Sequence, residues 1–183
     1  MLKKPSDTVH RLRSDALGEP PRIFAPSPGF AHGSWRELSG SCFAGPVLLT
    51  SLQALDQQQS ELVARYPEGI GTVNIIRLSS ASGQMGDSER AYSEGMVKRF
   101  GSKMRANATI IFGNGFVAAA ARSIMAAQRF ISRARYSDGT FSNLTAASAW
   151  IAKELHYSNE EGAAALAFFL ALFDACPPVN SPK

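Results

Sequence analysis

The strongest hydrophobic pattern in the chain is a short apolar run joined by a Gly-Asn-Gly turn to a long amphipathic segment. Residues 108–112 are mostly apolar or β-branched and end at Gly113, which predicts a strand buried in the middle of a sheet. Residues 115–135 follow with the spacing of a helix. The apolar face of this helix carries Ala120, Ile124, Ala127 and Ile131. The opposite face carries Arg122, Arg129 and Arg133.

The same reading predicts alternating strands and helices along most of the chain. Strands are predicted at residues 35–43, 71–78, 108–112 and 136–141, with a short edge strand within residues 22–30. Helices are predicted from Thr50 or Ser51 to Tyr66, from Asp87 or Ser88 to about residue 104, over residues 115–135, and from Thr145 to about residue 155. This order predicts a single layered α/β domain with a mostly parallel sheet of four to five strands and helices packed on it.

An extra helix is predicted at the C-terminal end, after a capping sequence at residues 158–161. Residues 163–173 are eleven consecutive apolar residues. As a helix they rise only about 16 Å, which is too short for a bilayer core of about 30 Å, so no membrane span is expected. Such a helix must be covered by its own domain, by a second subunit or by an apolar ligand or membrane surface. The candidate interaction residues on it are Phe168, Phe169, Leu172 and Phe173.

Composition sets the expected boundaries and compartment. Residues 1–21 are polar and predicted to be a flexible tail, residues 22–156 form the α/β domain, residues 157–176 form the apolar helix, and residues 177–183 form a second tail. The two cysteines, Cys42 and Cys176, lack the spacing of a zinc or redox motif, so free thiols in a reducing compartment are expected. The N-terminal residues resemble no signal or transit peptide. A cytoplasmic location is expected.

The basic charge is concentrated in the middle of the chain. Residues 87–135 hold nine Lys and Arg against three Asp and Glu, whereas residues 136–183 hold two against five. The arginines lack the interleaved aromatic residues and glycine spacing typical of a nucleic-acid platform, so nucleic acid is not an expected partner. The arginine face of residues 115–135 is either solvated or a docking surface for acidic groups, such as the negative C-terminal segment of another subunit.

Three stretches carry a family resemblance: residues 43–50 (FAGPVLLT), 108–113 (ATIIFG) and 141–151 (FSNLTAASAWI). With them, the chain over about residues 35–155 resembles STAS-like domains, and within these the bacterial branch of anti-sigma-factor antagonists that is compared with CRAL-TRIO lipid-transfer domains. The resemblance implies a regulatory domain that acts by binding. It also implies a phosphorylatable serine after a central strand, for which Ser80 and Ser82 are the candidates. Residues 79–83 have the hydroxyls and the glycine of that turn but lack its preceding aspartate.

A second candidate site is the turn Gly113-Asn114-Gly115. A strand, a turn and a helix in sequence leave free backbone N–H groups at the positive end of the helix dipole, where an anion or phosphate can bind. The turn lacks the Lys-Ser/Thr of a P-loop and the third glycine of a dinucleotide site. A tight structural turn is therefore the alternative interpretation.

No catalytic constellation is evident in the sequence. His10, His32 and His156 are predicted to lie in a tail, a loop and a helix end, and no Ser, Cys or carboxylate neighbour suggests an activated nucleophile or a general-base pair. No catalytic residue, metal site or cofactor is predicted. The chain is expected to be a non-enzymatic binding or regulatory module that acts through protein–protein interaction, as a homodimer or with another protein. The alternative is a carrier or sensor of a lipophilic small molecule.

Overall fold

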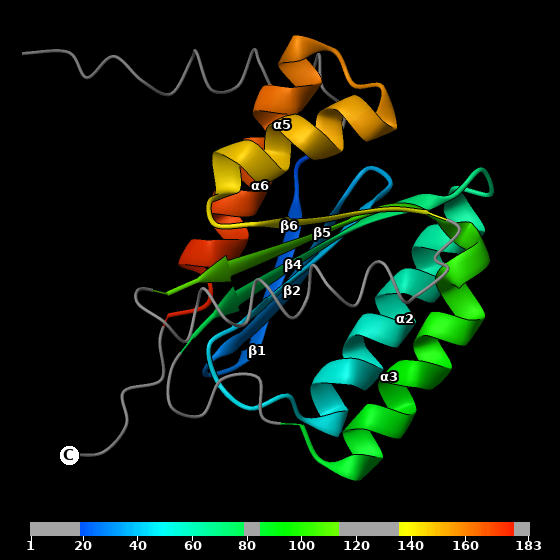
Figure 1. The fold of residues 1–183 in the computed structure, drawn as a ribbon, viewed down its shortest axis with the longest axis vertical. Helices are drawn as coiled ribbons and strands as arrows, with labels where there is room; N and C mark the ends of the chain where they lie inside the picture. Colours follow the sequence, from blue (N-terminus) through cyan, green and yellow to red (C-terminus); the bar gives the residue numbers. More distant parts are fainter. Residues whose placement is uncertain (1–18, 79–84, 114–135, 178–183) are drawn as a thin grey trace, which may run out of the picture.

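The structure is a computed structural model that describes residues 19–78, 85–113 and 136–177. In this part of the chain, six strands form one sheet between two pairs of helices (Figure 1). The strands are β1 (Arg22–Ser27), β2 (Phe30–Trp35), β3 (Leu38–Phe43), β4 (Ile70–Arg77), β5 (Met104–Phe112) and β6 (Ser137–Phe141). The helices are α2 (Leu49–Arg65), α3 (Asp87–Phe100), α5 (Leu144–Leu155) and α6 (Asn159–Asp174), with a 3₁₀ turn, η1 (Gly101–Lys103), between α3 and β5.

The sheet is mixed, and its strands follow the order of the sequence from β1 to β6. The strands β3, β4, β5 and β6 pair in parallel, whereas β1 and β2 add an antiparallel hairpin to one side. The prediction of a layered α/β domain is confirmed, with β5 inside the sheet and β1 at its edge. The prediction of four to five mostly parallel strands is corrected to six strands of mixed direction.

The strand missing from the prediction is β2, which forms a hairpin with β3 through a turn that has no typical turn residues. Residues 35–43 were predicted to form one strand, but Trp35 pairs with Leu38 across a two-residue turn of Arg36 and Glu37. Arg36 has a φ of 50°, in the left-handed region where turns of this length usually place Gly, Asn or Asp. Because Arg36 and Glu37 are not typical turn residues, the sequence predicted one continuous strand across the turn.

Three predicted helix caps are also corrected. The N-cap of α3 is Gly86 rather than Asp87 or Ser88, and no side chain caps this helix. The N-cap of α2 is Leu48 rather than Thr50 or Ser51, and it makes no side-chain capping bond. The N-cap of α5 is Asn143 rather than Thr145, and its Oδ1 accepts a hydrogen bond from the amide of Ala146 at 2.8 Å. The cap of α6 agrees with the sequence, since the Ser158 hydroxyl accepts from the amide of Glu161, and the Glu161 carboxylate accepts from the amide of Ser158.

The helices α5 and α6 cover one face of the sheet and enclose the larger core. Phe168, Phe169 and Leu172 of α6 are fully buried there against β2, β3 and α5. Gly40 in β3 makes this approach possible, because a Cβ at that position would collide with Leu172 and would lie 2.9 Å from the ring of Phe168. The C-terminal helix is therefore covered by its own chain.

The helices α2 and α3 lie on the other side of the sheet (Figure 1). A smaller core joins them to the sheet, formed by Phe30, Phe43, Leu52, Leu55, Met96 and Phe100. At the surface, Asp56 of α2 accepts hydrogen bonds from Tyr92 at 2.7 Å and from Arg99 at 2.6 Å, both on α3. Burial raises the pKa of Asp56, but these two bonds outweigh it and hold the pKa below its usual value.

Candidate functional site

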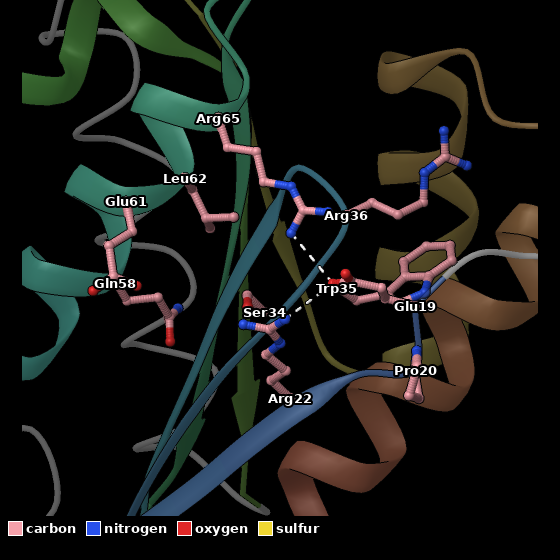
Figure 2. A pocket seen from close by; sticks show the side chains of 10 residues that line it. All are labelled: Glu19, Pro20, Arg22, Ser34, Trp35, Arg36, Gln58, Glu61, Leu62 and Arg65. Atoms are coloured by element: carbon pink, nitrogen blue, oxygen red, sulfur yellow. Dashed lines mark hydrogen bonds and ion pairs between the residues drawn. The ribbon is translucent and has the colours of Figure 1, made fainter.

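A pocket of about 180 Å³ lies where the β2–β3 hairpin meets the last turns of α2 (Figure 2). Its walls carry more charged and polar side chains than apolar ones. They are formed by Glu19, Pro20, Arg22, Ser34, Trp35, Arg36, Gln58, Glu61, Leu62 and Arg65. The pocket therefore brings together the start of β1, the end of β2 and one face of α2, which are separated in the sequence.

Two arginines of this pocket hold one carboxylate, and we call Arg22 and Arg65 with Glu19 the carboxylate clamp. The Oε2 atom of Glu19 lies 3.2 Å from Nη2 of Arg22 and 3.3 Å from Nη1 of Arg65 (Figure 2). All three side chains are more than half exposed. The hydrogen bond from Arg65, followed by the charges of Arg65 and Arg22, lowers the pKa of Glu19. The clamp can therefore hold an anionic oxygen at the surface of the protein.

Replacing Arg65 with glutamine should raise the pKa of the Glu19 carboxyl toward its ordinary value. Arg65 supplies the two largest effects that keep this group ionised, and glutamine removes the charge while retaining most of the side-chain length. A pH titration of the Glu19 carboxyl carbon by NMR measures the change. Arg99→Gln is the matched control, because Arg99 pairs with Asp56 instead. An identical Glu19 titration in wild type and Arg65→Gln would contradict the clamp.

The third arginine of the pocket, Arg36, contacts other residues than the clamp. The guanidinium of Arg36 lies 5.3 Å from the ring centre of Tyr157 and 5.8 Å from that of Trp35. It pairs with Glu161 at the start of α6 and lies 3.6 Å from Glu37. In Figure 2 its side chain points away from the clamp. Arg36 therefore connects the β2–β3 turn to α6 and leaves the anion contacts to Arg22 and Arg65.

Beside the pocket, Gln58 fixes the tautomer of His32. The Gln58 amide nitrogen donates to the carbonyl of Gly33 at 2.7 Å and to the hydroxyl of Ser39 at 2.8 Å, so its Oε1 is the acceptor toward His32 Nδ1 at 2.7 Å. The neutral imidazole therefore carries its proton on Nδ1. His32 lies in β2, stacked between Phe24 and Phe30, and not in the predicted loop.

A row of polar side chains crosses four strands on the face opposite α5 and α6. We call Ser41, Asn74, Asn107 and Asp138 the polar row. Ser41 donates to Asn74 at 2.9 Å, Asn74 donates to Asn107 at 2.9 Å, and Asn107 donates to Asp138 at 2.8 Å. The Thr72 hydroxyl also donates to the side-chain oxygen Oδ1 of Asn107, at 2.7 Å. Each step is a donation toward the carboxylate, so the amide orientations are mutually consistent.

Seven of the site residues predicted from the sequence lie outside the described residues. These are Ser80, Ser82, Asn114, Gly115, Arg122, Arg129 and Arg133. Gly113 is described, and it is exposed immediately after β5. The strands that lead to both predicted sites end side by side, since Arg77 pairs with Phe112 and the amide of Leu78 donates to the carbonyl of Phe112 at 2.9 Å. The strands β4 and β5 therefore end beside the C-terminal end of β3, which is the opposite end of β3 from the clamp.

Three of the four candidate interaction residues on the C-terminal helix lie in the core of their own chain, which is one of the alternatives expected for this helix. Phe168, Phe169 and Leu172 are buried in the core of their own chain, because Gly40 leaves room for them against the sheet. They do not form an exposed surface. Phe173 is partly exposed and packs on Phe112, with ring centres 4.8 Å apart.

Comparisons with known proteins add no relative: no family model, no curated protein and no solved structure gives a significant match to the chain. Among the described residues, no three His, Cys, Asp or Glu side chains are placed to hold a metal ion. Within the same residues, no helix combines the length and the apolarity that a membrane crossing requires.

The clamp could not be found by reading local motifs. Its residues lie at positions 19, 22 and 65, and the contact between Arg65 and Glu19 joins residues 46 positions apart. The polar row did leave a signal, because Thr72, Asn74, Asn107 and Thr109 are polar residues at alternate positions within apolar strands. Such alternation marks one polar face of a strand.

Proposed function

We propose that the chain is a non-enzymatic binding module that recognises a carboxylate-bearing segment of a partner protein, and that the carboxylate clamp is its recognition site. The observation that supports this most directly is Glu19, a carboxylate from the N-terminal end of the described chain, held between Arg22 and Arg65. The site is expected to prefer carboxylates as ligands, because a guanidinium group matches the two oxygens of a carboxylate in charge and geometry. Glu19 then acts as the internal occupant of a site meant for an external acid.

The size and exposure of the clamp favour a protein segment over a free metabolite. The pocket of about 180 Å³ is smaller than the roughly 300–1,000 Å³ typical of small-molecule sites. Both clamp arginines project from the surface, with more than half of each side chain exposed. A role in binding also agrees with the resemblance to STAS-like domains. The proposal includes self-association, in which an acidic segment of a second copy would bind the clamp or the arginine face predicted from the sequence for residues 115–135.

A carrier of lipophilic molecules has weaker support. The aromatic residues of α6, which suggested a lipid pocket from the sequence, fill the core of their own chain. The described pocket is lined by five charged side chains. The binding module is therefore the preferred proposal.

The test is isothermal titration calorimetry, in which the full chain is titrated with hexaglutamate at low ionic strength and the affinity is measured. The double variant Arg22→Gln with Arg65→Gln should weaken the affinity about tenfold or more, because both guanidiniums are lost. Glu19→Gln should strengthen binding, because the internal competitor loses its charge. The matched control, Arg90→Gln with Lys98→Gln, makes the same change in net charge on exposed residues of α3.

Three outcomes of this titration would reject the proposal. Equal losses in the clamp and control variants would indicate nonspecific attraction to a basic protein. Tighter binding of free glutarate than of hexaglutamate would indicate a small-molecule site. An affinity that does not change in Glu19→Gln would mean that Glu19 does not occupy the recognition site. Sedimentation of the same samples reports whether a second copy is the partner.

A further inference from the structure

The two cysteines of the chain meet in the core, although 134 positions separate them. Cys42 lies in β3 with its side chain on the face covered by α6, and Cys176 lies two residues beyond the end of α6. Both are fully buried. The Cys176 thiol donates a hydrogen bond to the backbone carbonyl oxygen of Cys42, with the sulfur 3.3 Å from that oxygen, and both side chains lie in the same core. Two buried thiols placed in this way are a pair that can be joined covalently.

An arginine sits beside this pair. Arg77, the last residue of β4, donates through Nη1 to the carbonyl of Cys176 at 2.7 Å and to the carbonyl of Phe173 at 3.1 Å. Its guanidinium also lies 4.0 Å from the ring centre of Phe173. These contacts place a fixed positive charge next to the thiols and tie the segment after α6 to the sheet.

The surroundings of the two sulfurs differ. The hydrogen bond from Cys42, the charge of Arg77 and the amides of Ala44 and Ala31 lower the pKa of Cys176, although burial opposes them. The hydrogen bond to Cys176 and burial raise the pKa of Cys42. Arg77 is bonded to the backbone carbonyl of Cys176, and Cys176 lies beyond the end of α6, whereas Cys42 lies inside the sheet. We therefore assign the first attack to Cys176 and the second to Cys42.

We propose that Cys42 and Cys176 form a redox modification site, at which a hydroperoxide converts the two thiols into a disulfide that fastens the end of α6 to β3. The Cys176 thiolate attacks the peroxide, an S–O bond forms as the O–O bond breaks, and the leaving oxygen departs with a proton as water or an alcohol. Cys42 then attacks the sulfenic sulfur, the S–S bond forms, and a second water leaves with the remaining proton. Two thiols are oxidised as one peroxide is reduced.

The reaction is gated by the position of Cys176. Its sulfur is reached only when the two residues after α6 move away from β3, and helix ends open more readily than cores do. The disulfide would be protected once formed, since both sulfurs are buried. It would also fix the position of Arg77, the last residue of β4, through its bonds to the carbonyls of Phe173 and Cys176. This site is separate from the carboxylate clamp and does not depend on the proposed binding function.

The experiment treats the reduced full chain with one equivalent of hydrogen peroxide, then alkylates it in denaturant and measures the intact mass. The expected product is a monomer that is about 2 Da lighter, takes up no alkylating agent and yields a linked peptide containing Cys42 and Cys176. Its melting temperature should rise, and dithiothreitol should reverse both changes. Two thiols that remain fully alkylatable, or that oxidise separately to sulfinic acids, would overturn the proposal.

Variants assign the order of the steps. Cys42→Ser should stop at a sulfenic acid that dimedone traps on Cys176, whereas Cys176→Ser should be nearly inert to the same dose of peroxide. Arg77→Gln should slow disulfide formation several-fold, and Arg77→Lys should restore part of the rate because it retains the charge. Equal reactivity of the two single-cysteine variants would contradict Cys176 as the attacking thiol. The wild-type mass measurement tests the disulfide itself even where a variant folds poorly.

Discussion

Replacing Phe168 with alanine should lower the free energy of unfolding by about 3–5 kcal/mol. Phe168 is fully buried in the larger core, beside Phe169 at 6.1 Å between ring centres and against Gly40 of β3. Alanine removes most of a ring from a tightly packed region and leaves a cavity, because the sheet on one side cannot move to fill it. Urea unfolding followed by circular dichroism gives the change directly.

The control for this substitution lies on the same helix. Leu170 is 46% exposed, so Leu170→Ala should change the free energy of unfolding by no more than about 0.5 kcal/mol. The pair also separates packing within the chain from packing between subunits. If α6 were held by a second copy, the loss in Phe168→Ala would depend on protein concentration. A concentration-dependent loss, or equal losses at the two positions, would contradict the burial of α6 in its own chain.

The elements that the sequence predicted well are those whose local pattern and tertiary role agree. The capping box of Ser158 and Glu161 is a local hydrogen-bond motif, and it forms as expected at the start of α6. The apolar run in β5 predicted a strand inside the sheet, and its residues Ala108 to Ile111 are buried. The fully apolar helix had to be covered, but only the fold could show by what, because Gly40 and Phe168 are far apart in the sequence.

The missed elements are those where a local rule was overridden. The turn of Arg36 and Glu37 has no glycine or asparagine, and contacts of Arg36 with Tyr157 and Glu161 hold it instead. These partners lie more than 100 positions away, so no local rule could register them. The N-cap of α2 was misplaced because Leu48 makes no side-chain capping bond. Tertiary packing, rather than a capping motif, fixes where that helix begins.

The candidate sites also fall into those with a local sequence signal and those formed by residues that are distant in the sequence. Sequence motifs favoured turns, and so predicted Gly113, Ser80 and Ser82, because turns carry recognisable residue types. The carboxylate clamp and the pair of cysteines consist of ordinary residues that only the arrangement of strands brings together. Neither Arg65 nor Cys176 has a neighbour in the sequence that would mark it as special. Their chemistry depends on contacts across the fold.

Replacing Asn107 with leucine should lower the free energy of unfolding by about 2–3 kcal/mol, because this side chain bonds two other members of the polar row and also Thr72. The side-chain oxygen Oδ1 of Asn107 accepts hydrogen bonds from Thr72 and Asn74, and its side-chain nitrogen Nδ2 donates one to Asp138. Leucine fills a similar volume but cannot hydrogen-bond. The loss of unfolding free energy therefore reports the cost of leaving the partner groups with fewer hydrogen bonds, and not the cost of a cavity. Chemical unfolding at pH 7 gives the value.

Thr72→Val is the comparison that makes this measurement specific to the row. It removes a single donor and keeps the shape, and Asn107 retains its bond from Asn74, so a loss of about 1 kcal/mol is expected. In a double variant, Thr72→Val should cost less in the Asn107→Leu background, because the bond it removes is already absent. Additive losses would mean that Thr72 and Asn107 contribute to stability independently. A non-additive result would establish that β4 and β5 are coupled through side chains on their polar face as well as through their backbone.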